Sequence, residues 1–329
     1  MSILVTGATG FTGKNLTEYL LKNYKSVRVL VRDKLKLGNL LKFPNLEIVE
    51  GNIYDESVVN KSMKGIDIVF NVAAIYRTSG IADQVYWDTH VKGTELLLEA
   101  ALREGVKKFI HTSTVGVHGD VGKDAPADEN SPFNPGDIYQ ITKLEGEKKV
   151  HQFYAEKGLP IVVIRPTAIY GPGDLRLLKL FKIASHKISF VLGNGKIKYH
   201  MVYIDDLVQG FILASKVEEA VGKAFIIGGE DAKSLNEILD DIGIAIGKSI
   251  QKFYLPAKPF QILGSIAEKI FIPLGINPPI YRRRVDFFTK SRSFDISKAK
   301  NILKYKPQFD LMDGIKKTAE WYKSNGHLS

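Results

Sequence analysis

Short runs of apolar, mostly β-branched residues alternate with helical patterns through the first half of the chain. The runs are continuous rather than alternating, which predicts strands covered on both faces by helices, as in a parallel sheet. Strands are expected at 3–6, 27–31, 46–49, 66–72, 108–113 and 160–164, and the helices between them include 13–23, 91–103 and 139–157. The pattern therefore predicts an α/β fold with a doubly wound parallel sheet.

The pattern becomes less regular after Arg165. Turn-rich stretches at 170–173 and 193–195 separate isolated strand and helix signals, which predicts a smaller C-terminal lobe. Ser234 and Glu237 form a capping-box motif that opens an apolar-periodic helix over 238–246. We expect a sheet domain at 1–165 and a substrate-binding lobe at 166–329, with 199–229 partly returning to the main sheet through a strand at 223–228.

Glycines at positions 7, 10 and 13 directly follow the first predicted strand and open the first predicted helix. Glycine permits the tight turn and lets a pyrophosphate approach the helix N-terminus, where free N–H groups and the helix dipole favour an anion. A glycine-rich turn without a ligand is the alternative, and the strand–turn–helix context disfavours it. The motif predicts that 1–165 is an NAD(P)-binding Rossmann domain with cofactor contacts at Gly7, Gly10, Phe11, Thr12 and Gly13.

The end of the second predicted strand bears on which dinucleotide is bound, because this position meets the adenosine ribose. An acidic residue there favours NAD, whereas the strand is expected to end at Val31 with Arg32 next. Arg32 would meet the 2′-phosphate, so we predict NADP in preference to NAD. If the strand ends later, Asp33 can bind the ribose hydroxyls and the preference becomes NAD.

Tyr139 and Lys143 stand four positions apart in a predicted helix, so their side chains share one face. A phenol with its ordinary pKa of about 10 is a weak acid–base group at neutral pH unless a nearby cation such as Lys143 stabilises the phenolate. A surface Tyr–Lys pair is the alternative explanation of this spacing. The end of the preceding strand supplies the hydroxyls of Ser113 and Thr114, which can fix a carbonyl or alcohol oxygen while hydride moves.

These motifs, together with the segment 165–173, resemble the extended short-chain dehydrogenase/reductase superfamily, which includes the NAD-dependent epimerase/dehydratase family. Their order and separations match over essentially the whole chain. The resemblance implies that Thr114, Tyr139 and Lys143 are the catalytic residues. It also implies cofactor contacts at Arg32, Asn52, Ile53, Ala73, Ala74, Ser113, Tyr139, Lys143 and Pro166, and we expect substrate contacts at Thr114, Tyr76, Ile169 and His200. For His200, a structural histidine with satisfied hydrogen bonds is the alternative.

Two departures bear on the branch of the superfamily. Nucleotide-sugar epimerases usually carry Asn and Arg where this chain has Ala168 and Tyr199, and the loss of these partners weakens binding of a diphosphate, although Lys198 offers a partial substitute. Segments between 259 and 307 resemble instead the 3β-hydroxysteroid dehydrogenase and dihydroflavonol-reductase-like branch.

We therefore expect an NADP-dependent oxidoreductase that acts on a ketone or secondary alcohol of a mainly apolar molecule of sterol, isoprenoid or flavonoid type. Two alternatives stay open. One is a nucleotide-sugar epimerase or dehydratase with a recycled cofactor, and the other is a non-catalytic dinucleotide-binding protein. The presence of Thr114, Tyr139 and Lys143 disfavours the non-catalytic alternative, because a protein that only binds the dinucleotide does not need all three.

Composition narrows the remaining possibilities. The chain has 329 residues and no cysteine, which excludes disulfides, thiolate metal sites and a cysteine nucleophile. Its seven histidines have no metal-ligand spacing, so no metal is expected, and His90 is interpreted as a buried, hydrogen-bonded residue. The net charge of +10 comes from dispersed lysines without a reader motif, so we expect a small-molecule substrate and no nucleic acid. Without a signal peptide or a spanning helix, the expected location is cytoplasmic.

A predicted helix at 260–274 carries apolar residues beyond one face, and Arg282, Arg283 and Arg284 follow it. Such a segment, within 253–284, can lie on an anionic membrane surface or cover an apolar pocket. A helix that simply packs on the lobe is the alternative. By resemblance, two outer helices, 91–103 among them, can form the seam of a homodimer.

Overall fold

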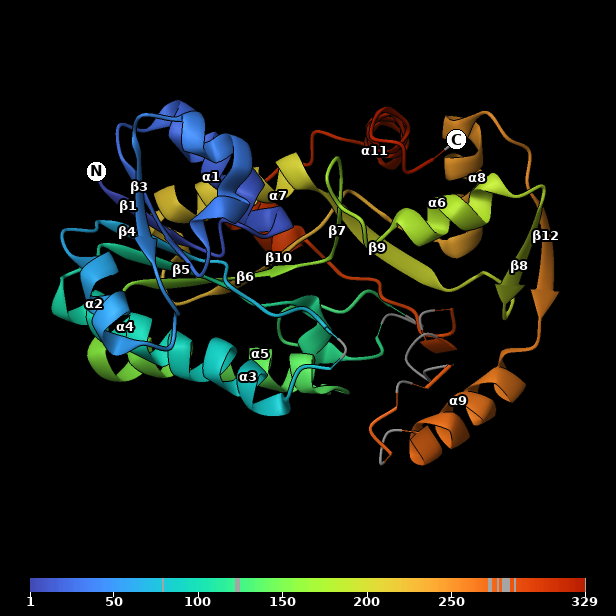
Figure 1. Ribbon diagram of the computed structural model, residues 1–329, viewed down its shortest axis with the longest axis horizontal. Helices are drawn as coiled ribbons and strands as arrows, with labels where there is room; N and C mark the ends of the chain where they lie inside the picture. Colours follow the sequence, from blue (N-terminus) through green and yellow to red (C-terminus); the bar gives the residue numbers. More distant parts are fainter. Residues whose placement is uncertain are drawn as a thin grey trace.

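A seven-stranded parallel sheet forms the larger part of the computed structural model (Figure 1). The structure describes residues 1–78, 80–121, 125–271, 274–276, 278–279, 285–286 and 288–328. The strands are β1 (Ile3–Thr6), β2 (Val27–Val31), β3 (Leu46–Glu50), β4 (Ile68–Asn71), β5 (Lys108–Thr112), β6 (Ile161–Pro166) and β10 (Ala224–Ile227). Their order is β10-β6-β5-β4-β1-β2-β3, and every pairing is parallel. The predicted fold class is confirmed.

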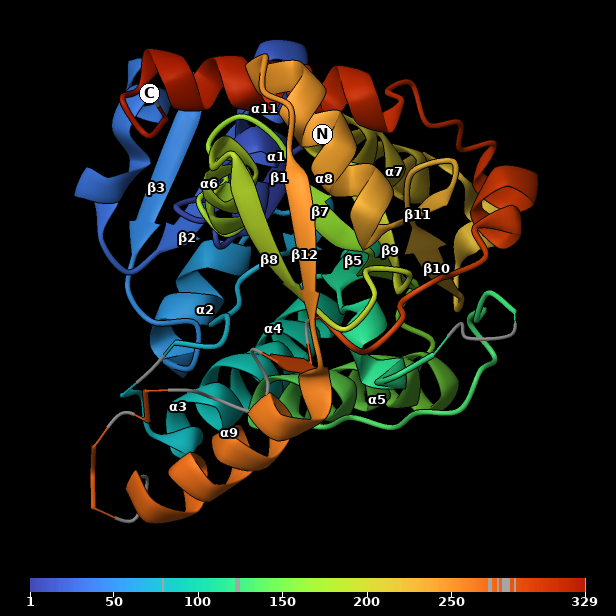
Figure 2. The same cartoon turned by 90° about the vertical axis from the view of Figure 1, so that its right-hand side faces the viewer.

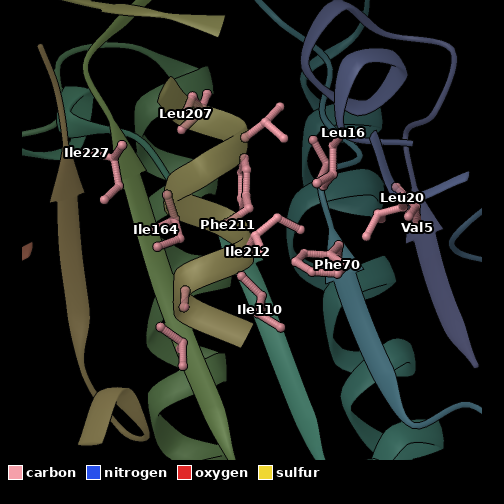
Figure 3. Close-up of a cluster of buried hydrophobic side chains, with 14 of the residues drawn as sticks. Val5, Leu16, Leu20, Phe70, Ile110, Ile164, Leu207, Phe211, Ile212 and Ile227 are labelled. Atoms are coloured by element: carbon pink, nitrogen blue, oxygen red, sulfur yellow. The ribbon is translucent and has the colours of Figure 1, made fainter. Parts of the chain in front are cut away.

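Helices cover both faces of this sheet. On one face lie α1 (Phe11–Asn23) and α7 (Ile204–Lys216), where Leu16 and Phe211 pack on Phe70 and Ile110 of the strands (Figure 3). On the other face lie α2 (Glu56–Met63), α4 (Gly93–Arg103) and α5 (Ile138–Lys157). Successive strand residues point to opposite faces, so strands buried on both sides need the continuous apolar runs seen in the sequence.

Short helical turns connect these elements. They comprise α3 (Asp83–Trp87), a wide helical turn at Asp88–Lys92 that leads into α4, three 3-10 segments at Lys34–Lys42, Val115–His118 and Glu218–Ala220, and a wide turn at Ala299–Leu303. The predicted helix at 91–103 is thus divided between the wide turn and α4.

The C-terminal lobe is built on a three-stranded sheet. Its strands are β7 (Ala168–Tyr170), β9 (Lys198–Tyr203) and β11 (Ala232–Ser234), and α6 (Leu178–Ser185), α8 (Leu235–Ile246) and α11 (Leu311–Ser324) pack with them around buried Phe181 and Tyr322. The predicted capping box at the start of α8 is confirmed. The Ser234 hydroxyl accepts from the Glu237 amide at 3.2 Å, and the Glu237 carboxylate accepts from the Ser234 amide at 2.7 Å.

A two-stranded parallel ribbon, β8 (Ile188–Leu192) with β12 (Gln251–Leu255), leads into α9 (Ala257–Phe271). Figures 1 and 2 both show α9 projecting from the body of the molecule at the end of β12. The basic cluster at Arg282, Arg283 and Arg284 lies outside the described residues. No helix in the described part of the chain is long and apolar enough to cross a membrane.

Candidate active site

The first crossover of the sheet places a glycine-lined turn against the backbone after β4. Gly7 has a φ of 75°, and a Cβ atom there would lie 2.8 Å from the backbone of Ala73, so only glycine permits this close approach. The Thr6 hydroxyl fixes the same junction by accepting from the Val72 and Ala73 amides at 3.1 Å each. The turn is therefore a rigid cradle beside the N-terminus of α1.

The N-terminus of α1 is free to bind an anion. Its N-cap is Gly10, which offers no side-chain hydrogen bond to the first turn, and that turn, which includes Phe11 and Thr12, holds no acidic residue. Unsatisfied N–H groups and the helix dipole make such an end an anion site. The cradle and the uncapped helix together fit the pyrophosphate of a dinucleotide.

The end of β2 lies where the sequence predicted it, at Val31. Arg32 follows on the surface, and no carboxylate of the described residues forms an ion pair with it. Asp33 is engaged locally, because its side chain accepts from the Leu35 amide at 2.9 Å and caps the following 3-10 segment. The free cation thus stands at the strand end, and the carboxylate is held in a cap.

The other predicted cofactor contacts lie near the same edge with different exposures. Asn52 is partly buried, whereas Ile53 is buried and packs in the core beneath the sheet. Ala73 is partly buried and Ala74 is exposed directly after β4, Ser113 follows β5 and Pro166 ends β6. Parallel strands bring their carboxyl ends to one edge, which is where ligands bind in this architecture.

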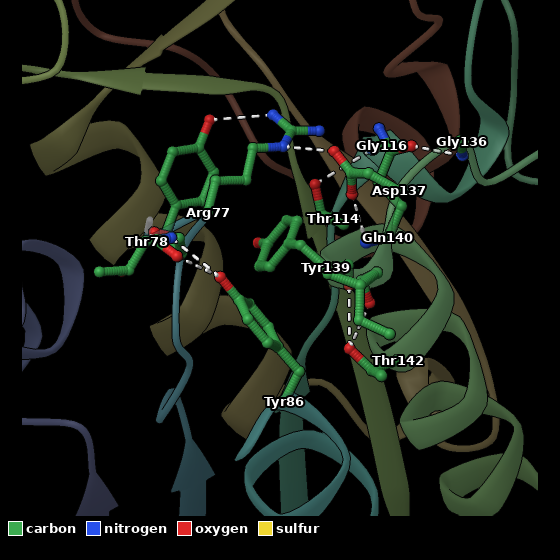
Figure 4. Close-up of polar contacts among 12 residues, drawn as sticks. Arg77, Thr78, Tyr86, Thr114, Gly116, Gly136, Asp137, Tyr139, Gln140 and Thr142 are labelled. Carbon is green, nitrogen blue, oxygen red and sulfur yellow. Dashed lines mark hydrogen bonds and ion pairs between the residues drawn. The ribbon is translucent and has the colours of Figure 1, made fainter. Parts of the chain in front are cut away.

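Tyr139 and Lys143 lie in the first half of α5, and their side chains are buried. The Tyr139 hydroxyl makes no hydrogen bond to the described residues, while the Lys143 ammonium donates to the Thr112 carbonyl. Thr114 follows β5, and its hydroxyl accepts from the Gly116 amide at 3.0 Å, which leaves its own proton available. Figure 4 shows Thr114 beside the Tyr139 ring. The structure thus brings the three predicted catalytic residues together.

Burial dominates the ionisation of this pair. It raises the pKa of Tyr139, and the neighbouring Tyr76 adds to this, while the charges of Arg77 and Arg176 act in the opposite direction. Burial also lowers the pKa of Lys143 to about 8, partly offset by Glu147. The role of Lys143 as the cation that stabilises the phenolate stays a prediction. In the structure the charges of Arg77 and Arg176 also oppose the rise in the pKa of Tyr139.

The loop after β4 places Tyr76 and Arg77 over Tyr139. The rings of Tyr76 and Tyr139 meet edge to face at 5.1 Å, and the Arg77 guanidinium lies 5.4 Å from both ring centres. Arg77 Nε donates to Asp137, the N-cap of α5, at 2.7 Å (Figure 4). Arg77 has a φ of 31°, a conformation that a non-glycine residue adopts only when its surroundings impose it.

His200 and Ile169 take different places in the lobe. Ile169 is partly exposed on β7, whereas His200 is buried on β9 and its Nε2 bonds to the Gly229 carbonyl at 2.8 Å. Successive strand residues point to opposite faces, so His200 faces away from the side occupied by Tyr199. The structure does not bring His200 to the other predicted site residues. Its Nε2 is hydrogen-bonded, as in the structural alternative, but its buried Nδ1 has no hydrogen-bond partner among the described residues.

His90 is buried and hydrogen-bonded, as predicted. Its Nε2 accepts from the Ile75 amide at 3.0 Å, and its Nδ1 lies 2.8 Å from the Thr142 hydroxyl, which itself donates to the Ile138 carbonyl. Burial lowers the pKa of His90 to about 2, so the ring is neutral. It ties the loop before Tyr76 to α5.

Sequence reasoning missed two arginines around Tyr139. Arg77 and Arg176 follow β4 and β7. Each is far from Tyr139 in sequence, and no spacing rule links them. Their location after strands at one edge of a sheet is the signal that points to them.

A doubly wound sheet whose first crossover ends in a glycine-lined, uncapped helix N-terminus is the architecture of dinucleotide-binding enzymes. The chain belongs to the NAD dependent epimerase/dehydratase family, whose model matches residues 3–228. It is thus an enzyme that uses a nicotinamide dinucleotide, either as a dehydrogenase or reductase or as an epimerase, as the resemblance predicted.

The chain is similar in sequence both to hydroxysteroid dehydrogenases and to nucleotide-sugar epimerases. The chain is 29% identical to the 3beta-hydroxysteroid-dehydrogenase/decarboxylase isoform 1 of Arabidopsis thaliana, over 96% of this chain and 78% of the relative. It is also 29% identical to a UDP-glucose 4-epimerase of Vibrio cholerae, over 97% and 94% of the two chains. The solved structure of a UDP-glucuronic acid 4-epimerase from Bacillus cereus with NAD superposes with a TM-score of 0.80 at 28% identity, covering 99% of each chain. Identity alone does not separate the two branches.

Proposed function

We propose that this enzyme transfers hydride between a nicotinamide dinucleotide and a ketone or secondary alcohol on a mainly apolar substrate of sterol, isoprenoid or flavonoid type. The observation that carries the proposal is the Tyr139 hydroxyl, which has no hydrogen-bond partner among the described residues and belongs to a ring that Figure 4 draws next to Thr114. The bound dinucleotide supplies or accepts the hydride. In reduction, Tyr139 donates its proton to the carbonyl oxygen while Thr114 holds that oxygen by a hydrogen bond.

The protonation state of Tyr139 sets a condition on this assignment. The raised pKa of Tyr139 keeps the phenol protonated at neutral pH but makes it a weaker proton donor, so the assignment needs the nearby cations that oppose this rise. Accepting a proton from an alcohol requires the phenolate, which the charges of Arg77 and Arg176 stabilise. Lys143, with a pKa of about 8, remains mostly cationic at pH 7, and in this proposal it holds the nicotinamide ribose.

NADP is the proposed cofactor. Arg32 at the end of β2 is an exposed guanidinium without a carboxylate partner among the described residues, and Asp33 is engaged as a cap. A guanidinium binds a phosphate through charge-assisted, bidentate hydrogen bonds, so Arg32 suits the 2′-phosphate.

The test of the proposal is Tyr139→Phe, which removes only the phenolic proton. We expect turnover to be abolished with a 3β-hydroxysteroid as the substrate, while dinucleotide affinity stays within a few-fold of wild type. Turnover is followed by NADPH absorbance and affinity by calorimetric titration. Retained turnover would refute the assignment. Lys143→Met should weaken dinucleotide binding as well as turnover, because it also removes a cofactor contact.

Nucleotide-sugar epimerisation is the second candidate function, and the similarity to a UDP-glucose 4-epimerase favours it. The two functions differ in the fate of the cofactor, because an epimerase regenerates it within the site. We expect the purified enzyme to exchange bound dinucleotide freely with labelled NADP in solution. A tightly retained dinucleotide, together with interconversion of UDP-glucose and UDP-galactose, would establish the alternative.

We also propose that α9 lies on an anionic membrane surface. Ile262, Leu263, Ile266 and Ile270 each expose about half or more of their side chains along this helix. Lys258 and Lys269 border a shallow hollow that includes Ile262 and Ile266. Apolar side chains flanked by cations are what a helix at the surface of an anionic bilayer requires.

A further inference from the structure

The segment 75–78, which follows β4, is anchored at both of its ends. At its start, the Ile75 amide donates to His90 Nε2 at 3.0 Å. At its end, the Thr78 amide donates to the Tyr86 hydroxyl at 2.9 Å (Figure 4). The two partners lie on α3 and on the wide helical turn that follows it. The residues between the two anchors therefore have a fixed position.

Arg77 lies in this segment with its guanidinium over the Tyr139 ring. The distance from the guanidinium carbon to the ring centre is 5.4 Å. Its Nε donates to the Asp137 carboxylate at 2.7 Å, and one terminal nitrogen donates to the Tyr76 hydroxyl at 3.1 Å. The φ of 31° at Arg77 shows that the backbone accepts strain in this arrangement. The direction of the side chain is thus fixed at both its backbone and its charged end.

The ion pair of Arg77 with Asp137 is shielded from solvent. The two side chains expose only 28% and 27% of their surfaces, and charges act more strongly where water screens them less. The charge of Asp137 acts against that of Arg77 on the pKa of Tyr139, but its effect is the smaller of the two. The pair therefore acts on the phenol as a cation.

Arg77 differs from Lys143 in keeping its charge at alkaline pH. Burial lowers the pKa of Lys143 to about 8, so Lys143 loses most of its charge as the pH rises above this value. A guanidinium stays protonated throughout this range. Accepting a proton from an alcohol requires the phenolate of Tyr139, which alkaline pH favours. Arg77 remains a cation beside the phenol under these conditions.

Tyr139 is surrounded by charged and titratable groups from several segments. They are Tyr76, Arg77, Tyr86, His90 and Arg176, with Asp137 and Lys143 on or next to its own helix. His90 is neutral, because burial lowers its pKa to about 2. Arg176 acts on Tyr139 in the same direction as Arg77 but less strongly, and it lies over the Tyr76 ring. Arg77 is therefore the cation with the largest effect on the phenol.

We propose that Arg77 is a positioning residue for the reaction, whose guanidinium, fixed by Asp137, holds a permanent positive charge over the Tyr139 ring and so favours the phenolate. This inference rests on the proposed function for the role of Tyr139. In oxidation, the alcohol O–H gives its proton to the phenolate oxygen while the carbinol carbon loses hydride to the dinucleotide. In reduction, the same charge makes the phenol a stronger proton donor.

A titration of the phenol at position 139 measures this effect without turnover. A trifluorotyrosine is incorporated at position 139 alone, because its fluorines lower the pKa of the phenol and allow the titration to be followed in the folded protein. The midpoint is read from ¹⁹F spectra recorded as a function of pH. We expect Arg77→Gln to move this midpoint upward by about one pH unit, because the phenolate loses a nearby cation.

Two variants control for the nature and the place of the charge. Arg77→Lys keeps a cation that can reach Asp137, so its midpoint should lie closer to that of wild type than to that of Arg77→Gln. Arg103→Gln removes an exposed arginine at the end of α4 and should leave the midpoint unchanged. Equal melting temperatures show that the variants are folded.

The pH profile of alcohol oxidation gives the second readout, with natural tyrosine at position 139. The limb of kcat/KM that rises with pH should move upward in Arg77→Gln by the same amount as the midpoint. At a fixed pH on this limb, a shift of about one unit lowers kcat/KM about 10-fold. A loss of activity from disturbed structure alone would lower the profile without moving it along the pH axis.

An unchanged midpoint in Arg77→Gln would overturn the inference. The same holds if Arg77→Lys moves the midpoint as far as Arg77→Gln, or if Arg103→Gln moves it equally, because the charge over the ring is then not the cause. Failure of the proposed function is recognised separately. Tyr139→Phe would then retain turnover, whereas the ¹⁹F midpoints would still report whether Arg77 acts on the phenol.

Discussion

At the scale of single residues, the electrostatics of Tyr139 depend on side chains that the sequence does not place beside it. The motif pairs Tyr139 with Lys143, yet the Lys143 ammonium donates to the Thr112 carbonyl at the end of β5. Asp137, which precedes Tyr139 by two residues, forms an ion pair with Arg77. This ion pair holds the Arg77 guanidinium over the Tyr139 ring. A helix N-cap thus also positions a cation over the reactive phenol.

Arg32 carries the prediction for cofactor choice. Arg32→Ala should weaken NADPH binding by about 1.5–3 kcal/mol, because it removes a charge-assisted contact to the 2′-phosphate, and should leave NADH binding nearly unchanged. Calorimetric titration of both dinucleotides measures the difference. Lys42→Ala, at the far end of the 3-10 segment that follows Arg32, is the control for a general loss of positive charge.

Equal losses for the two dinucleotides would show that Arg32 does not read the phosphate. If wild type binds NADH more tightly than NADPH and Asp33→Asn reduces this preference, the ribose contact belongs to Asp33 instead. In that case Asp33 must leave the cap that it forms with the Leu35 amide.

At the scale of elements, the central sheet was predictable because its strands are buried on both faces. Continuous β-branched runs then mark a strand without ambiguity, and the predicted bounds of 3–6 and 27–31 agree with β1 and β2. The helix that covers the sheet at 204–216 was not predicted. It starts directly from β9 at Ile204 with no turn residues between the two elements, although Asp205 and Asp206 in its first turn are a helix-start signal.

The candidate site was predictable to the extent that its residues share a motif. Local spacing links Gly7 to Gly13, which share one turn. It also links Tyr139 to Lys143, which share one helix face. Arg77 and Arg176 reach the site only through the three-dimensional arrangement of the segments after β4 and β7, which local spacing does not encode. The orientation of His200 likewise follows from strand register, which a one-residue shift would reverse.

The ion pair between Glu147 and Arg165 joins α5 to β6 and underlies the next prediction. Both side chains are buried, and Arg165 Nε donates to the two carboxylate oxygens at 3.1 Å and 3.2 Å. Glu147→Gln should lower the free energy of unfolding by about 3–5 kcal/mol, because it leaves a buried guanidinium without its counter-charge. Urea denaturation measures the loss. Glu145→Gln, which removes the surface partner of Lys148, should change it by less than about 0.5 kcal/mol.

The pH dependence of stability gives a second readout of the same pair. Burial acts to raise the pKa of Glu147, but hydrogen bonds from His151 and Arg165 and the charge of Arg165 hold it below its ordinary value. A depressed pKa in the folded state stabilises the protein above the unfolded value of about 4.5, and this contribution is lost as the pH falls. Wild type should therefore lose stability more steeply than Glu147→Gln in acid. Parallel curves would show that the pair does not stabilise the fold.

At the scale of the whole molecule, α9 leaves an apolar surface at one end of the lobe. Gly264 is buried and Gln261 bonds to Thr289 at 3.2 Å, so one side of the helix is attached to the protein. The other side presents Ile262, which is 61% exposed, with further apolar side chains along it. The preceding ribbon adds Phe190 and Phe253, which are also exposed. Because β12 leads directly into α9 (Figure 2), the exposed apolar side chains continue from the ribbon onto the helix.

Magnitudes predict how this surface should bind. Inserting a half-exposed isoleucine contributes on the order of 1 kcal/mol, and each lysine near an anionic surface contributes about the same. Neither contribution alone gives stable attachment, so binding should depend on both. We expect the protein to sediment with vesicles that contain phosphatidylserine at low salt and to be released at high salt, because salt screens the lysines but not the apolar side chains.

Ile262→Asp should prevent sedimentation at low salt, because it places a negative charge in the centre of the apolar surface and beside an anionic bilayer. Ile244→Asp is the matched control, since Ile244 is 65% exposed on α8, an element distant from α9 in Figure 1. Equal melting temperatures of the two variants separate binding from folding. Absence of sedimentation at every salt concentration, or equal loss in both variants, would assign α9 to the protein itself as a cover of its cleft. The substrate would then be sought among dissolved compounds rather than membrane lipids.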